Sequence, residues 1–334
     1  MVKNLVKKIL PPFLRNIVQK KYKKITIFKS NIYDLKRYSK YSGTNGFSNK
    51  IKLEAIIVKE YHVIEKGLTM PNTRFGFGEA KIISLYEYCD IYVSKYGLST
   101  QIKHAISVIK EYKDFHLDNS FQLNDKIEKA IEKLLDLDKT VLKSSQIRTT
   151  KEDYFKNINS PFPVFSATRK SVRNYSNEDI SLVKLEKALE LALNTPSACN
   201  KQGSRIHIYS DKNYINRILN IQGGSRGFGD LTNKLIIITS ELGAFSETTE
   251  RYQAYIDGGM FAMNLLYALH SQEIACCILN CSNTPEKDKA LQSICKIKKS
   301  EVFIAMIACG IPPEEFSVAL SPRYDLIEIN TYHE

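Results

Sequence analysis

The sequence predicts a chain in two parts, an all-helical N-terminal half followed by a layered domain of α+β or α/β class. In the first part, apolar residues recur at helical spacing over 52–148, where no convincing β-alternation is present. In the second part, short apolar runs alternate with helical segments, an order typical of a sheet covered by helices. We therefore expect a basic segment at 1–30, a helical domain over 31–155 and a layered domain over 160–334.

Composition excludes several classes of protein. The 334 residues are 43% hydrophobic and 25% charged, which is typical of a soluble globular protein and not of a disordered one. No run approaches the roughly 18 consecutive apolar residues of a transmembrane helix, and the N-terminus lacks the separate charged and apolar regions of a secretory signal. None of the seven cysteines forms a C-x-x-C pair, so we expect no zinc site. The cysteines in apolar runs such as IACCIL and IAMIACG are typical of reduced, buried residues in a cytoplasmic protein.

Residues 1–30 contribute most of the surplus positive charge. They contain nine Lys or Arg and no acidic residue, in a chain whose net charge is +12. Interleaved apolar residues predict an amphipathic basic helix that is broken or restarted at Pro11 and Pro12. Such a helix suits peripheral contact with the anionic inner membrane face; the alternative is a solvated terminus that packs one face on the body. No nucleic-acid-reading motif accompanies the charge, so we expect no nucleic-acid partner.

The helices expected in the N-terminal half lie at 52–68, 79–97, 101–115 and 124–145. Gly67 and Gly97 are the expected stops of the first two. His62 and Glu65 are three positions apart on one face of the first helix, a spacing that suits a metal site, an acid–base pair or a plain surface hydrogen bond. Both are therefore candidate substrate contacts.

The layered domain is predicted from a further series of segments. A helix over 179–195 is capped by Ser176 or Asn177. Next come a strand at 205–210, a helix at 211–221, a strand at 234–240, a helix at 250–272, a strand at 274–281, a helix, and a strand at 301–310. The helix over 250–272 is apolar almost all round and should be deeply buried. Its Gly258–Gly259 pair, unfavourable in a helix, is explained by close approach of another helix.

Two loops differ from their surroundings in composition. The stretch SATRKSVRNYS at 166–176 places Arg169, Lys170 and Arg173 around Ser171, which is either a solvated charge run or a preorganised anion site. The stretch QGGSRGFGD at 222–230 matches neither a dinucleotide fingerprint nor a P-loop. It is either a mobile loop that closes over an active site, with Arg226 available to an anionic substrate, or a plain surface connection.

Segments in a fixed order make residues 166–330 resemble the nitroreductase family of FMN-dependent oxidoreductases. They are RKSVRNYS, NTPSACNKQ, IDGGMFAMNLLYALHSQEIACC, VFIAMIACGIPPE and LSPR. The resemblance implies an α+β fold, a three-layer α/β/α sandwich with a mostly antiparallel central sheet. It also implies FMN bound at a homodimer interface. The helical half lies outside the common core of this family.

The resemblance implies a role for each matching residue. Arg169 and Ser171 would hold the phosphate and ribityl end of FMN, with Arg323 as a second phosphate contact. Arg173 would face the pyrimidine edge, where positive charge stabilises the reduced flavin. The other cofactor-binding candidates are Lys170, Pro196, Ser197, Asn200, Gln202, Asn280 and Cys281. In this family the residues that match Ser197, Asn200 and Gln202 come from the partner subunit; ordinary turn capping is the alternative.

The expected activity follows from the same resemblance. NADH or NADPH would pass hydride to flavin N5 and be replaced by a small-molecule acceptor on the same flavin face. Two places depart from the family: Gly203 and Ser204 stand where Pro-Trp is common, and Asn280–Cys281 stands where Glu-Gly is common. Two alternatives stay open, a specialised flavin dehydrogenase or reductase of a biosynthetic intermediate, and a membrane-surface flavoprotein partner without turnover.

Overall fold

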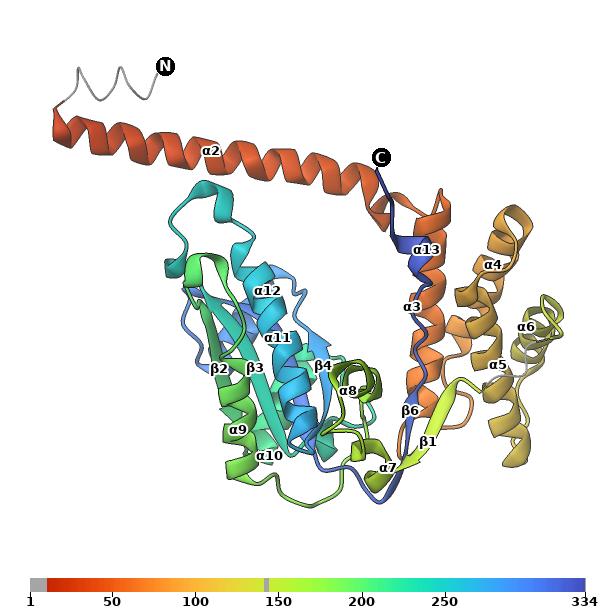
Figure 1. Cartoon of the computed structure of the whole chain (residues 1–334). Coiled ribbons are helices and arrows are strands. Elements are labelled where there is room, and N and C mark those ends of the chain that lie inside the picture. The colour runs from red at the N-terminus through yellow and green to blue at the C-terminus, as the bar shows by residue number, and fades with distance from the viewer. Residues whose placement is uncertain (1–10, 141–143, 334) are drawn as a thin grey trace.

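The protein is described here from a computed structural model that covers residues 11–140 and 144–333 (Figure 1). Helices make up the N-terminal part, and a sheet with helices on both faces makes up most of the C-terminal part, as predicted. The first ten residues of the predicted basic segment lie outside the described ranges. Within these ranges, no helix combines the length and the apolar character that a membrane span requires.

A helical bundle with its own core forms most of the N-terminal part. It consists of α3 (Lys50–Leu68), α4 (Glu79–Tyr96), α5 (Thr100–Asp118) and α6 (Asp125–Asp136). The side chains of Asn49, Ser99 and Asn124 cap α3, α5 and α6 by accepting hydrogen bonds from backbone N–H groups. Apolar residues at helical spacing, such as Ile57 and Leu85, are fully buried between the helices. Each such burial contributes about 2 kcal/mol to folding.

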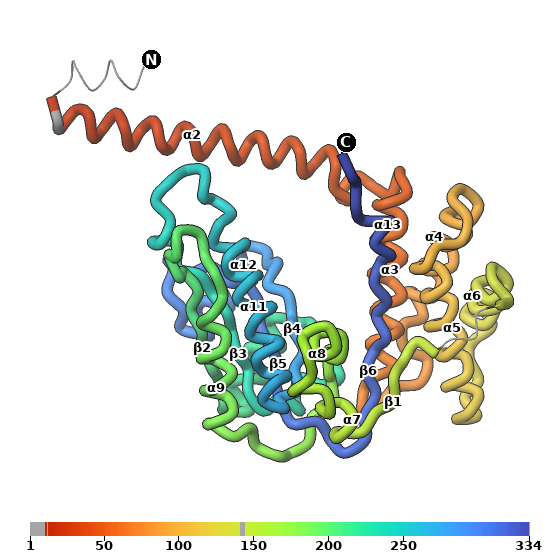
Figure 2. The backbone as a smooth tube through the Cα atoms, viewed as in Figure 1, coloured from red at the N-terminus to blue at the C-terminus, as the bar shows by residue number. Residues whose placement is uncertain are grey.

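Helix α2 (Pro12–Tyr41) is an arm that stands apart from this bundle (Figures 1 and 2). It begins at Pro12, where the sequence predicts a restart, since proline is tolerated in the first turn of a helix. Towards its C-terminal end, Asp34 accepts hydrogen bonds from Arg251 Nε (2.7 Å) and the Tyr252 hydroxyl (2.8 Å). Much of the arm nevertheless exposes apolar side chains.

One expected helix stop and one predicted helix end in the bundle are wrong. α3 ends at Leu68, as predicted, but Gly67 lies inside the helix, where a Cβ would lie 2.1 Å from the ring of Phe77, so this glycine serves close approach and not helix termination. α6 ends at Asp136, well before the predicted end at residue 145. Beyond it, Asp138 Oδ1 accepts the backbone N–H of Thr140 (2.9 Å), a local bond that competes with continued helix.

The central sheet of the C-terminal part has the strand order β2-β3-β5-β4, and each neighbouring pair is antiparallel. Its strands are β2 (Ser204–Tyr209), β3 (Lys234–Glu241), β4 (Ala275–Asn280) and β5 (Glu301–Gly310). One face packs on α9 (Leu182–Ala192) and α11 (Gln253–Ser271), the other on α10 (Lys212–Gln222) and α12 (Pro285–Cys295). Along β3, Ile236 packs in the core beneath α9 and α11, and Ile237 packs in the core beneath α10 and α12, because successive side chains of a strand point to opposite faces. The predicted three-layer α+β sandwich is confirmed.

A two-stranded sheet joins the two parts of the chain, and the sequence did not predict it. β1 (Gln146–Thr150) pairs antiparallel with β6 (Glu315–Ala319), so the C-terminal segment returns to the helical bundle beside α3 (Figure 1). A short polar strand has no apolar alternation, which is why its pattern gives no signal. Short helical segments complete the described fold: α7 (Lys151–Phe155), α8 (Phe162–Thr168), α13 (Leu326–Ile329), and 3₁₀ turns at Gly43–Asn45, Ala198–Asn200, Gly229–Leu231, Leu242–Ala244 and Thr248–Glu250.

The predicted cap of α9 is wrong. The helix begins at Leu182 and follows Ser181, whose side chain makes no capping hydrogen bond. Ser176 is pinned elsewhere, because its backbone N–H (2.8 Å) and its hydroxyl (3.1 Å) both donate to the carbonyl of Ile311 just after β5. A tertiary contact therefore occupies Ser176, the residue that the local pattern predicts as the helix cap.

The predictions for α11 also need correction. A Cβ at Gly258 would lie 2.6 Å from the side chain of Ile304 in β5, so this glycine admits the sheet and not another helix. A Cβ at Gly259 would meet no described atom within 4 Å. The helix is buried on one side only, since Tyr255 and Ile256 are 50% and 53% exposed.

Candidate functional site

The basic stretch after α8 is an extended segment that lies along β4, an edge strand of the central sheet. The N–H of Val172 donates to the carbonyl of Cys276 in β4 (3.0 Å). The hydroxyl of Tyr175 donates to the carbonyl of Ala308 in β5 (2.9 Å), and both Val172 and Tyr175 are buried. These anchors hold the cationic residues of the stretch in fixed places.

Arg173 is buried without a partner. It is only 6% exposed, yet its Nε and Nη1 atoms make no hydrogen bond to any residue that the structure describes. The buried Nε atom of Arg169 lacks one as well. A guanidinium group stays ionised in proteins, and an unpaired buried charge is strongly unfavourable. The two arginines are therefore arranged for an anionic group that the described residues do not supply.

Arg169 and a second arginine, Arg323, both lie close to Lys170, and we call these three residues the Lys170 cluster. Burial lowers the pKa of Lys170, and the nearby charges of Arg323 and Arg169 lower it further. No carboxylate in the described ranges lies within ion-pair distance of these three side chains. Like charges gathered without a counter-ion indicate a site for an anion.

Arg173 has its own cationic neighbours, which we call the Lys66 cluster (Lys66, Arg173 and Arg226). Burial lowers the pKa of Lys66, and the charges of Arg173 and Arg226 add to this effect. Lys66 is on α3, so the helical bundle contributes one of the three cations. Its Nζ donates to the carbonyl of Gly224 (3.4 Å), and no described carboxylate pairs with any member of the cluster.

The predicted pair His62 and Glu65 belongs to a hydrogen-bond network that holds the C-terminal segment. Glu65 is fully buried and accepts hydrogen bonds from His104 Nε2 (2.9 Å) and the backbone N–H of Ser321 (3.0 Å). His62 Nδ1 lies 3.4 Å from its other oxygen. Burial alone would raise the pKa of Glu65, but the hydrogen bonds from His104 and His62 lower it to about 2. Because Ser321 is two positions before Arg323, this carboxylate helps to place the Lys170 cluster.

The predicted residues at 196–202 form a turn elsewhere on the domain. The hydroxyl of Ser197 accepts the N–H of Gln202 (2.9 Å), which is the geometry of turn capping. Asn200 and Gln202 have φ angles of 54° and 49°, a left-handed conformation that is uncommon for residues other than glycine. Pro196, Asn200 and Gln202 are exposed.

This turn and the Lys170 cluster lie at opposite ends of α11. The N–H of Ala198 donates to Asp257 (3.1 Å), while at the other end Thr168 Oγ1 lies 3.0 Å from His270 Nε2. Burial and the charge of Arg169 lower the pKa of His270 to about 4. Asp257 and His270 are separated by roughly 20 Å of helix. One chain does not bring the two predicted sets together.

Asn280 and Cys281 lie at the end of β4, further along the strand that anchors the basic stretch. The carbonyl of Asn280 accepts a hydrogen bond from Gln222 Nε2 (3.0 Å), and the Asn280 side chain is exposed. Burial raises the pKa of the Cys281 thiol to about 12, so this cysteine is not a nucleophile at neutral pH.

A cavity of about 1120 Å³ opens between the helical bundle and the glycine-rich loop over 222–230. At its rim, Gly227 has a φ of 93°, and a Cβ there would lie 3.1 Å from the sulfur of Met70. The loop therefore packs on the end of α3. The residues that matter for its chemistry are Lys66, Arg74, Lys81, Arg226 and Asp230. Neither His62 nor Glu65 lines the cavity, and sequence reasoning missed Lys66 because helical spacing does not distinguish it from a solvated lysine.

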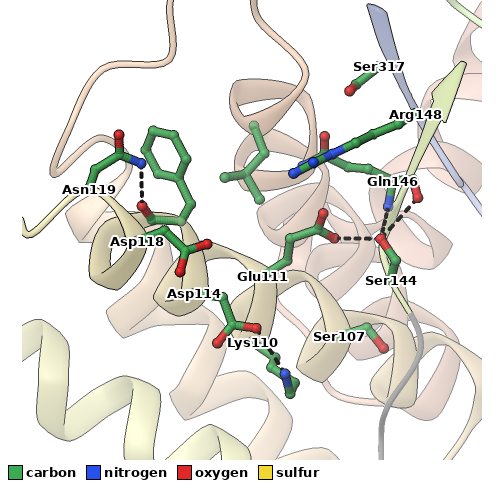
Figure 3. Close-up of a pocket in the computed structure, with 12 residues that line it drawn as sticks. Ser107, Lys110, Glu111, Asp114, Asp118, Asn119, Ser144, Gln146, Arg148 and Ser317 are labelled. Atoms are coloured by element: carbon green, nitrogen blue, oxygen red, sulfur yellow. Dashed lines mark hydrogen bonds and ion pairs between the residues drawn. The ribbon is translucent and has the colours of Figure 1, made fainter. Parts of the chain in front are cut away.

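A second hollow, of about 640 Å³, lies between α5 and β1 (Figure 3). Glu111 there accepts hydrogen bonds from the backbone N–H of Ser145 (2.8 Å) and the hydroxyl of Ser144 (3.1 Å). Lys110 pairs with Asp114 (2.9 Å). None of the buried, unpartnered polar atoms of the described residues belongs to this hollow, so it holds the start of β1 and does not indicate a ligand. Within the same ranges, no group of three or more His, Cys, Asp or Glu residues is arranged to hold a metal ion.

Residues 167–226 match the sequence model of the nitroreductase family, which confirms the family resemblance of the layered domain. No curated protein matches this chain in sequence. Solved structures similar to this chain include a putative NADH oxidase from Clostridium acetobutylicum, with 20% identity, a TM-score of 0.45, and coverage of 51% of this chain and 99% of that one. A putative nitroreductase in complex with FMN from Desulfovibrio desulfuricans has 20% identity, a TM-score of 0.46, and coverage of 52% and 98%. An FMN-dependent nitroreductase from Clostridium difficile has 18% identity, a TM-score of 0.44, and coverage of 51% and 98%.

Proposed function

Because residues 167–226 match the model of the nitroreductase family, we propose that this chain is an FMN-dependent oxidoreductase that passes hydride from NADH or NADPH to a small-molecule acceptor. The observation that supports this most is Arg173, whose buried guanidinium has no counter-ion within the described residues. FMN has an anionic phosphate and a ring that becomes electron-rich on reduction, so its chemistry fits a site with two clusters of cations.

The Lys170 cluster is suited to the FMN phosphate. Guanidinium groups bind phosphate oxygens through paired, charge-assisted hydrogen bonds, which a lysine cannot form. Arg169 and Arg323 would provide these bonds, and Lys170 would add charge. The hydroxyl of Ser171, in the same anchored stretch, is available as a further donor.

Arg173 is suited to the ring end of FMN. The cofactor, when bound, supplies the centre that accepts and releases hydride. In this chain Arg173 would place a fixed positive charge beside the ring, and positive charge favours the reduced state. Asn280 and Cys281, at the far end of β4, would adjoin the same ring. No side chain of this site has to donate or remove a proton for the hydride to move.

We further propose a homodimer, in which the turn at 196–202 of one subunit completes the site of the other. Two observations support it: the separation of this turn from the Lys170 cluster along α11, and the apolar surface that α11 exposes at Tyr255, Ile256, Met260 and Met263. Light scattering of the purified protein tests the proposal. A mass near twice 38.2 kDa is expected, and a monomer that binds FMN fully would contradict it.

FMN binding is the first experiment. Purified protein, incubated with FMN and then desalted, is expected to keep about one flavin per chain and to lose its yellow absorbance when NADPH or NADH is added without oxygen. Protein that stays colourless would overturn the proposed function. Flavin that binds but is reduced by neither nucleotide would instead favour a flavoprotein partner without turnover.

The acceptor is proposed to be a specialised, biosynthetic one. The cavity supports this, because the helical bundle lies outside the common family core and supplies one of its walls. Rapid reduction of a generic quinone would count against it.

The arm α2 supports a second proposal, peripheral contact at the inner face of the membrane by a cytoplasmic protein, since it exposes Phe13, Tyr22 and Phe28 among lysines. Equal co-sedimentation with anionic liposomes by the full chain and a variant lacking residues 1–30 would exclude this contact.

A further inference from the structure

Two members of the Lys66 cluster, Lys66 and Arg226, face a space that is separate from the Lys170 cluster. Lys66 and Arg226 both line the cavity between the bundle and the 222–230 loop, whereas Arg169, Lys170 and Arg323 do not. Arg173 does not line this cavity, but its positive charge lowers the pKa of Lys66, which does. The chain thus offers more positive charge than a single phosphate group needs, and it offers part of it inside a separate cavity.

The cavity has an excess of unpaired positive charge. Of its cationic lining residues, Lys81 is neutralised by Glu60 (2.9 Å), while Lys66, Arg74 and Arg226 pair with no carboxylate that the structure describes. The acidic lining residue Asp230 is exposed and forms no described ion pair with Arg226. Lys66 is half-buried beside two arginines, an arrangement that is unfavourable unless an anion offsets the repulsion.

The shape and lining of the cavity indicate a small molecule. Its volume of about 1120 Å³ slightly exceeds the range of about 300–1,000 Å³ that is typical of pockets for drug-sized molecules. Met70, Phe77 and Leu219 provide apolar wall, and Asn72, Asn216 and Asn220 provide amide groups for orientation. A nucleic acid or a protein segment would need an open groove, whereas the 222–230 loop closes one side by its contact with Met70.

We propose that Lys66 and Arg226 bind a phosphate or carboxylate group of a small-molecule reactant, so that the helical bundle selects an anionic substrate for the flavin site. The inference rests on the proposed function, because the flavin makes this cavity part of a reaction site. The bundle then has a direct role: α3 supplies Lys66, and the 222–230 loop supplies Arg226. The anion belongs either to the electron acceptor or to the 2′-phosphate of NADPH.

The test uses FMN-loaded protein and inorganic pyrophosphate as the probe, measured by calorimetric titration at low ionic strength. The double variant Lys66→Gln/Arg226→Gln is expected to bind pyrophosphate at least about tenfold more weakly than the wild type, since each lost charge-assisted contact is worth about 1.5 kcal/mol or more. The matched control, Lys59→Gln/Arg217→Gln, removes two exposed cations from α3 and α10 and should bind like the wild type.

The outcomes separate this inference from the proposed function. Wild-type affinity in the double variant, or equal loss in the control, would overturn the inference while FMN content still reports on the function. If the double variant loses both its FMN and its affinity for pyrophosphate, then Lys66 and Arg226 belong to the cofactor's own site. That result would also overturn the inference. If the wild type takes up no FMN, the proposed function fails, and the same titration in an Arg169→Ala background still decides whether the cavity binds an anion.

Two arms identify the source of the anion. If the anion is the 2′-phosphate of NADPH, the double variant should lose NADPH affinity and keep NADH affinity. If it belongs to the acceptor, both nucleotides should reduce the flavin of the double variant as they do in the wild type, and citrate, a tricarboxylate, should compete with pyrophosphate in the wild type. Unchanged use of both nucleotides combined with no competition by citrate would contradict a reactant site.

Discussion

Glu65 in the helical bundle and Arg173 in the layered domain are both buried charged side chains, but their surroundings differ. Glu65 accepts hydrogen bonds from His104 and Ser321, with His62 near its second oxygen. Arg173 has two nitrogen atoms without a partner among the described residues, and the cation Lys66 lies near it. Removal of a buried charge whose partners are complete leaves those partners unpaired and destabilises the fold, whereas a buried charge whose partners are missing indicates a ligand. Between these two residues the roles are therefore divided: Glu65 serves the fold, and Arg173 serves binding.

The strongest test of this division is Glu65→Ala. The variant leaves His104 and the Ser321 N–H without their buried acceptor, so we expect the free energy of unfolding to fall by about 3 kcal/mol. Urea denaturation measures it, with Glu87→Ala, an exposed position on α4, as the control that should change little. A loss no larger than that of the control would remove Glu65 from its structural role.

The pH dependence of stability separates the two regions by their titration windows. The folded pKa of His270, about 4, is below the ordinary value of about 6.5, so the unfolded state takes up the proton first. The free energy of unfolding should therefore fall as pH drops from about 6.5 to about 4, by about 3 kcal/mol in all. Glu65, whose folded pKa is about 2, contributes a loss only below about pH 4.3.

Denaturation of the wild type and of His270→Phe at pH 7, 5.5 and 4 checks this window. The variant should lack the loss between pH 6.5 and 4. An anion bound at Arg169 offsets the positive charge that acts on His270, so added FMN should reduce the loss in the wild type. A variant that loses as much stability as the wild type would assign the transition to another group.

Arg169→Ala tests the binding side of the comparison. Loss of a charge-assisted contact worth about 2 kcal/mol should weaken FMN binding by about 30-fold. Fluorescence titration with FMN measures this, and Arg217→Ala, at an exposed position of α10, is the matched control. Full flavin occupancy in Arg169→Ala after desalting would exclude this arginine from the phosphate site.

The smallest expected effect has the opposite sign. In FMN-free protein, Arg173→Met replaces an unpaired buried charge with an apolar chain of similar length, so the free energy of unfolding should rise by about 1 kcal/mol. The same variant, if it still binds FMN, should lower the reduction potential of the flavin because positive charge beside the ring is lost. If Arg173→Met instead destabilised the FMN-free protein, Arg173 would have stabilising partners and would not be an unpaired charge.

Much of the fold could be predicted from local pattern. The spacing of apolar residues identified the bundle helices and the strands of the central sheet, because each element places its buried side chains at a regular interval along the chain. The errors occur where a distant residue intervenes. Gly67 is needed because Phe77 packs against it, and Gly258 is needed because Ile304 does. Ser176 does not cap the helix because its hydroxyl bonds to the carbonyl of Ile311. The short strand β1 was missed because its pairing with β6 lies in neither segment alone.

By itself the sequence determined that the chain has a helical half and a layered domain, and that Arg169, Ser171 and Arg173 lie in a stretch that resembles the nitroreductase family. Only the tertiary structure decided that Glu65 is an anchor for Ser321, and that Lys66 joins Arg173 and Arg226 beside a cavity. The reason is physical. Secondary structure follows from interactions over a few residues, whereas burial, pairing and the convergence of charge depend on segments that the chain brings together from far apart, and these decide which charged side chains are satisfied and which are left for a ligand.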